Sequence, residues 1–178
     1  GLRGRRKANN EDSSSPIDII PTYDIMIIQY TRYYMYHRNN LINLSEILRR
    51  IPVAVAFVRG DRVHQNINGN VRFYQTPKGA FVVADISGLP ISSGKCENEI
   101  FSLHIHGGSS CTGNTKDPFA DAGMHYNPTD CPHPYHAGDM PPLFSADGTA
   151  FLAFLTNRFT AYEIIGKTVI IHDRPDDF

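Results

Sequence analysis

Between residues 53 and 172, short runs of apolar, β-branched and aromatic residues alternate with turn-forming residues. The runs lie at 53–58, 70–74, 81–86, 100–106, 150–155 and 167–172. The breaks between them contain glycine, proline, asparagine or aspartate, at 60–61, 68–69, 77–79, 87–90, 146–148 and 165–167. Asn68-Gly69 and Asp147-Gly148 tolerate the positive φ of tight hairpins. Many short strands at this spacing indicate an all-β protein, either a sandwich or a barrel.

The N-terminal part of the chain follows other patterns. Residues 23–36 are apolar and rich in tyrosine, which fits a strand or a short helix and carries no visible chemistry. Residues 41–50 place leucine and isoleucine at helical spacing, and Pro52 ends that pattern because proline disfavours helix in the residue before it. We therefore predict an N-terminal extension over 1–50, partly disordered or forming a short helix, and a β domain over 51–178.

Composition narrows the classes of function. The chain has 178 residues, of which 41% are hydrophobic and 20% charged, as in soluble globular domains. A formal net charge of −1 gives no general argument for binding nucleic acid. No uncharged apolar stretch reaches the ~18 residues of a membrane span, and no secretory signal is visible at the start. Charge is uneven, with a balance of +3 in residues 1–50 and −4 in residues 51–178.

Histidine is the unusual residue, because six of the eight lie between positions 104 and 172. His104 and His106 are two apart on a predicted strand, so both side chains share one face and can reach the same ion. Residues 107–139 show no strand pattern, and a loop of about thirty residues in a compact domain is usually functional or disordered. The strand, this loop and the last run together supply the candidate ligands His104, His106, His125, His133, His136, Asp139 and His172.

These side chains indicate a centre that holds two metal ions. Four imidazoles suit copper, whereas three imidazoles and a carboxylate suit tetrahedral zinc. Two four-coordinate sites need eight ligand positions, and the seven candidate side chains provide them if one imidazole is shared between the ions. Copper and zinc are therefore the expected cofactors.

Five motifs resemble the copper–zinc superoxide dismutase family, in the family's order. They are His104-Ile105-His106, Gly123-Met124-His125-Tyr126-Asn127-Pro128, His133 eight residues after His125, His136-Ala137-Gly138-Asp139-Met140, and Ile165-Gly166-Lys167-Thr168-Val169-Ile170-Ile171-His172. The resemblance covers about residues 53–178.

The resemblance implies an immunoglobulin-like Greek-key β-barrel or sandwich with a long metal-binding loop, the architecture of this family. It implies an antioxidant oxidoreductase that disproportionates superoxide to O₂ and H₂O₂ at a copper centre, bridged by a histidine to a structural zinc. The implied copper ligands are His104, His106, His125 and His172, and the implied zinc ligands are His125, His133, His136 and Asp139. His125 would be the bridging, catalytic residue, and Asp176 would link a copper-ligand imidazole to a zinc-ligand imidazole.

The sequence departs from the family pattern in three places. His133 and His136 are three apart, closer than in the common forms, so the zinc loop is shortened. The glycine-rich turn after His106 lacks the acidic or aromatic residue often found there. The family's electrostatic loop, guiding cation, second cysteine and terminal strand would follow Phe178. We therefore expect a bacterial-type member, truncated at its C-terminus and lacking the final loop and strand.

The chain has three cysteines. The resemblance implies that Cys111 forms the family's disulfide, with a partner that would lie beyond residue 178. A disulfide between Cys96 and Cys131 and a set of three free thiols both remain open, because connectivity cannot be deduced from sequence.

The sequence leaves alternatives open for both the function and the cellular location. The expected partner is superoxide, a small anion, with no nucleic acid and no membrane span, and homodimers are common in the family. A non-enzymatic copper- and zinc-binding module on the same fold is the alternative function. Cupric chemistry and a disulfide favour a cell-surface or extracytoplasmic location, whereas the lack of a visible signal peptide favours the cytoplasm or an incomplete N-terminus.

Overall fold

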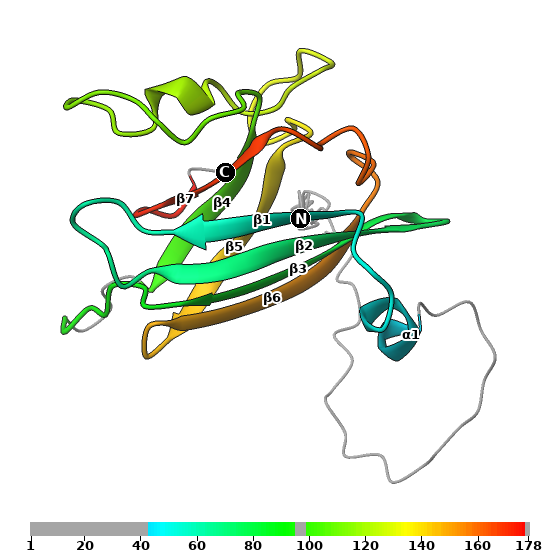
Figure 1. Ribbon diagram of the computed structural model, residues 1–178, viewed down its shortest axis with the longest axis horizontal. Coiled ribbons are helices and arrows are strands. Elements are labelled where there is room, and N and C mark those ends of the chain that lie inside the picture. Colours follow the sequence, from blue (N-terminus) through cyan, green and yellow to red (C-terminus); the bar gives the residue numbers. More distant parts are fainter. Residues whose placement is uncertain (1–42, 95–98, 177–178) are drawn as a thin grey trace, which may run out of the picture. The chain divides into compact units, whose positions relative to one another are not determined.

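The computed structural model describes residues 43–94 and 99–176. Seven strands form the body of this described part (Figure 1). They are β1 (Ala54–Arg59), β2 (Asn68–Thr76), β3 (Gly79–Ser87), β4 (Ile100–His106), β5 (Asp139–Ala146), β6 (Thr149–Thr156) and β7 (Thr168–His172). The all-β class is confirmed, and all six predicted runs coincide with strands. The prediction for residues 1–42 lies outside the described residues.

The strands form one antiparallel sheet in the order β1-β2-β3-β6-β5-β4-β7. Figure 1 shows β1, β2, β3 and β6 side by side, with β5 and β4 crossing behind them. The sheet curls until β1 and β7 approach each other without pairing, which gives a nearly closed barrel. This curl is the usual consequence of strand twist, and it encloses a single apolar interior.

The interior is filled by alternate residues of the strands. Its fully buried members include Val71 and Phe73 of β2, Val82 of β3, and Leu103 and Ile105 of β4. Because neighbouring positions on a strand point to opposite faces, the residues between these members lie on the outside of the barrel. The outer face of β4 is the face that carries the histidines.

Strand β5 was not predicted, and its two prolines explain why. Pro141 and Pro142 remove backbone donors, so the sequence reads as a break rather than a strand. The structure accommodates them with an irregularity, since the register between β4 and β5 shifts between Phe101 and Leu103.

The predicted break at Asn68-Gly69 is wrong, because both residues lie inside β2. Gly69 is required there by a close approach, since a Cβ at this position would lie 2.2 Å from the carbonyl oxygen of Asp85. The break at Asp147-Gly148 is confirmed as the two-residue turn between β5 and β6, with both residues at positive φ.

A short helix, α1 (Leu44–Leu48), falls within the predicted helical stretch. Asn43 caps it by accepting a hydrogen bond from the Glu46 amide, and Ile47 packs on the outer face of β2 and β3 against Tyr74, Phe81 and Val83. The division of the chain near residue 50 remains a prediction. None of the described helices has the length and apolar character needed to cross a membrane.

Candidate metal centre

The centre starts from three adjacent strands. Leu103 and Ile105 face the interior, so His104 and His106 lie on the outer face of β4. On one side, β5 pairs Asp139 with His104. On the other side, β7 pairs His172 with Ser102. Cross-strand partners share a face, so the register alone gathers a carboxylate and three imidazoles on one surface of the sheet.

The loop between β4 and β5 returns across this surface. The amide of Gly107 donates to the carbonyl of Met124 at 2.8 Å, and the amide of Tyr126 donates to that of Ile105 at 2.8 Å. These bonds form an isolated bridge that sets His125 opposite His106. Since the loop continues the hydrogen bonding of β4, His125 lies beside the histidines of the strand.

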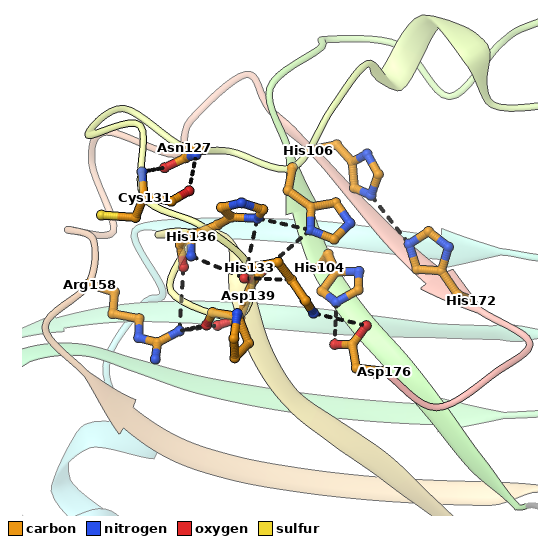
Figure 2. A network of polar contacts seen from close by, with 12 residues as sticks. His104, His106, Asn127, Cys131, His133, His136, Asp139, Arg158, His172 and Asp176 are labelled. Atoms are coloured by element: carbon orange, nitrogen blue, oxygen red, sulfur yellow. Dashed lines mark hydrogen bonds and ion pairs between the residues drawn. The ribbon is translucent and has the colours of Figure 1, made fainter. Parts of the chain in front are cut away.

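The structure brings all seven predicted ligands together. Two groups have candidate donor atoms that lie within 4.8 Å of one another: His104, His106, His125 and His172, and His125, His133, His136 and Asp139. His125 is a member of both groups. Figure 2 shows the labelled members of the two groups lying next to each other over β4.

Hydrogen bonds to groups outside the first set orient its imidazoles. His104 donates from Nε2 to Asp176 at 2.6 Å, because a carboxylate can only accept. Its Nδ1 is buried and has no hydrogen-bond partner within the described chain. His106 donates from Nδ1 to the carbonyl of Gly123 at 2.7 Å, which leaves its Nε2 3.3 Å from the Nε2 of His172. Unprotonated ring nitrogens are therefore directed toward one point, as metal ligands require.

Protonation is disfavoured in this group. The pKa of His172 is lowered to about 4, first by burial and then by the neighbouring His104 and His106. Burial also lowers the pKa of His106, against the carbonyl of Gly123, which raises it. The pKa of His125 is lowered by burial and by His104, although its hydrogen bond with Asp139 raises it. Neutral imidazoles keep the lone pairs that bind metals.

The second group surrounds a buried carboxylate. The Nδ1 atoms of His125, His133 and His136 lie 2.8, 3.0 and 3.3 Å from oxygens of Asp139. Burial raises the pKa of Asp139, but the hydrogen bond from His125 and the charges of His136 and His133 outweigh it and lower the pKa. Three imidazoles and an ionised carboxylate match the donor set of tetrahedral zinc.

One further carboxylate touches both groups. Asp176 has one oxygen 2.6 Å from His104 Nε2 and the other 3.8 Å from His133 Nε2, and its side chain is 10% exposed. The resemblance implied a link of this kind at this residue. The neighbouring Asp177 lies outside the described residues.

Two residues of the site could not be assigned from the sequence. Asn127 belonged to a quoted motif, but its function was not predicted: its side chain accepts from the Cys131 amide at 3.0 Å and donates to the Cys131 carbonyl at 2.8 Å. Arg158 was not singled out, and its guanidinium contacts carbonyls of the loop. Both contacts involve backbone atoms, which residue types and spacing do not reveal.

The described cysteines do not form a disulfide. Cys111 is an exposed free thiol and Cys131 is a partly buried one. Cys96 lies outside the described residues. The predicted disulfide is therefore not shown by the structure.

Comparisons with known proteins agree with this geometry. A sequence model of the copper/zinc superoxide dismutase family matches residues 67–178. The copper–zinc superoxide dismutase of Schizosaccharomyces pombe is 32% identical over 136 residues, which are 70% of this chain and 80% of the relative. The human copper chaperone for superoxide dismutase is 28% identical over 138 residues, which are 73% of this chain but only 45% of the relative. The solved Cu/Zn superoxide dismutase from Brucella abortus shares the fold, with a TM-score of 0.57 at 22% identity over 70% of this chain and 84% of that one.

Proposed function

This chain belongs to the copper/zinc superoxide dismutase family, and from this premise we propose that it converts two superoxide ions and two protons into O₂ and H₂O₂. The first group of ligands would hold copper and the second would hold zinc. The observation that carries the proposal is the membership of His125 in both groups. A shared imidazole couples the two ions, which two separate binding sites would not do.

The donor atoms fit these ions. The buried Nδ1 of His104 has no hydrogen-bond partner in the described chain, and leaving such a nitrogen without a ligand is costly. Copper, when bound, supplies the one-electron oxidation and reduction that superoxide requires, whereas zinc has no redox chemistry. The residues of the chain then have to hold the imidazoles in place and deliver protons.

His125 is the residue that we propose to carry a proton. Its Nδ1 lies 2.8 Å from Asp139 and is committed to the second group. Its other ring nitrogen, Nε2, would then serve the first group, to which His125 also belongs. Protonation of Nε2 would place one of the two required protons beside the reduced oxygen species, and solvent would supply the other.

The remaining contacts keep this arrangement fixed during turnover. Asp176 and the carbonyl of Gly123 each hold the non-ligating nitrogen of one imidazole. Hydrogen bonds of this kind set the tautomer and the direction of the ring. The low pKa of His172 supports the same assignment, because this imidazole stays neutral at physiological pH.

A non-enzymatic role in binding copper and zinc is the second candidate. It is favoured by the similarity to a human protein named as a copper chaperone, of which this chain spans 45%. Both functions need the same metal ligands, so only a measurement of turnover separates them.

The test is the rate of superoxide consumption by the chain loaded with copper and zinc, compared with the chain loaded with zinc alone. A chelator that suppresses free copper should be present in both. We expect a copper-dependent rate that His172→Gln reduces at least about tenfold, because even the loss of a group that only orients a metal ligand typically costs about 10- to 100-fold. The control is His64→Gln, which changes an exposed histidine bonded to Asp61. Stoichiometric copper binding without turnover would reject the enzymatic proposal in favour of the binding module.

A further inference from the structure

Arg158 connects the end of β6 to the loop that carries the second group of ligands. Its amide donates to the hydroxyl of Thr156, the last residue of β6, at 3.2 Å. Its Nη1 lies 2.9 Å from the carbonyl oxygen of Pro134 and 3.4 Å from those of His136 and Asp139. Figure 2 shows the guanidinium approaching the loop from the side of His136 and Asp139.

The loop segment held by these bonds has little regular structure of its own. Residues 132–138 belong to neither a helix nor a strand. Before Gly138, which pairs with Ile105 and Tyr126, the backbone bonds of this segment are local, such as the one from the Tyr135 amide to the Pro132 carbonyl at 2.8 Å. Three carbonyl dipoles directed at one point repel one another, and a cation between them removes that repulsion. The arginine therefore stabilises a backbone conformation that is otherwise unfavourable.

This conformation determines where the ligands point. Two of the three carbonyls belong to His136 and Asp139, whose side chains are members of the second group. The third belongs to Pro134, which follows the ligand His133. Holding the backbone on one side thus directs three of the four donors of this group toward the common point.

The charge of Arg158 also repels a metal dication, which opposes the positioning effect of its hydrogen bonds. Arg158 is exposed, so water and salt screen its long-range field. Its hydrogen bonds act at 2.9 to 3.4 Å on the ligand backbone and are screened much less. The positioning effect should therefore exceed the repulsion.

We propose that Arg158 is a positioning residue for zinc, which keeps the second group of ligands converged. This inference rests on the proposed function, because it takes zinc as the ion of that group. It concerns zinc binding and not the copper group, where His104 and His106 are held by strand β4. Loss of a residue that orients metal ligands typically lowers metal affinity about 10- to 100-fold.

The experiment measures zinc affinity of the full chain by competition with a chromophoric chelator. Arg158→Met keeps the apolar stem and removes the charge and the donors. Arg158→Lys restores the charge on a shorter side chain with a single nitrogen. Arg62→Met is the matched control, since Arg62 is equally an exposed arginine in a loop. Cobalt(II) absorption reports the geometry of the zinc group, and the copper(II) paramagnetic resonance spectrum reports the copper group.

We expect Arg158→Met to lower the affinity for zinc about 10- to 100-fold and to reduce the absorption of tetrahedral cobalt(II). Arg158→Lys should recover part of the affinity, and Arg62→Met should match the parent. The copper spectrum of Arg158→Met should match the parent when enough zinc is present to fill the second group. Zinc affinity of Arg158→Met within twofold of the parent would overturn the inference. If the parent binds zinc but does not consume superoxide, the proposed activity is rejected. The role of Arg158 is then still decided by the zinc affinity of Arg158→Met. If the parent binds no zinc, both are overturned.

Discussion

At the scale of single residues, His104 and His106 each have one ring nitrogen available because another group occupies the second one. Asp176 accepts from Nε2 of His104, and the carbonyl of Gly123 accepts from Nδ1 of His106. The available nitrogen therefore differs between two histidines on the same strand.

Asp176 should affect both metals, unlike Arg158. Replacing Asp176 by asparagine removes the negative charge that favours the Nε2–H tautomer of His104 and faces Nε2 of His133. We expect affinity for copper and for zinc each to fall about 10- to 100-fold in Asp176→Asn, measured by chelator competition. Asp173→Asn, a change at an exposed neighbouring aspartate, should leave both affinities unchanged. A loss confined to one metal would contradict the bridging role.

At the scale of elements, the metal loop is attached to β4 by backbone pairing. The amide of Ile105 donates to the carbonyl of Gly138 at 2.9 Å, and the amide of Gly138 donates to that of Tyr126 at 2.8 Å. The phenol of Tyr126 also donates to Glu163, before β7, at 3.0 Å. The loop that seemed irregular in sequence is thus an ordered layer over the sheet.

Gly138 permits this close contact between the loop and β4. A Cβ at Gly138 would lie 2.3 Å from the carbonyl oxygen of Ile105, so alanine would force the loop away from the strand. We expect Gly138→Ala to lower the free energy of unfolding by about 1–3 kcal/mol, as overpacking typically does, when measured by urea denaturation. Gly107→Ala is the control, because its Cβ would meet only an ordinary contact at 3.7 Å. Equal free energies of unfolding for the two variants would show that the loop can move away from β4 without loss of stability.

Features that depend on side-chain patterns could be predicted from the sequence, whereas features that depend on backbone contacts could not. The strands with alternating residue types and the His104-His106 pair could be predicted, because the sequence shows directly which side chains alternate along a strand. Strand β5 could not, because Pro141 and Pro142 conceal it. The roles of Gly138 and Arg158 could not be predicted either, since both act on carbonyl oxygens that every residue possesses.

At the scale of the whole molecule, the metal centre and the apolar core lie on opposite faces of the same strand. Leu103 and Ile105 pack inside the barrel, while His104 and His106 face the loop. The core does not depend on metal ligands for its packing. We therefore expect the metal-free chain to keep its fold, with a stability that depends on the protonation of the unoccupied histidines.

The stability of the metal-free chain should fall as the pH falls. The pKa of His172 is lowered from 6.5 to about 4, first by burial, and burial also lowers the pKa values of His106 and His125. Below pH 6.5 the unfolded chain binds protons at these positions that the folded chain does not bind, so stability falls as the pH falls. For His172 this loss extends down to about pH 4. The lowered pKa of Asp139 adds a loss in the same direction, but only below its usual value of 3.8.

Urea denaturation of the chelator-treated chain at several values between pH 7.5 and pH 4.5 measures this slope, within the window that the His172 pKa defines. The midpoint should move to lower urea as the pH falls. His172→Gln should flatten the curve, because it removes the most strongly shifted histidine. Bound zinc and copper compete with protons for the same nitrogens, so the loaded protein should be more stable and lose its metals as the pH falls. An unchanged slope in His172→Gln would mean that the imidazoles are not protected from protons in the metal-free fold, and that the centre is formed only when metal binds.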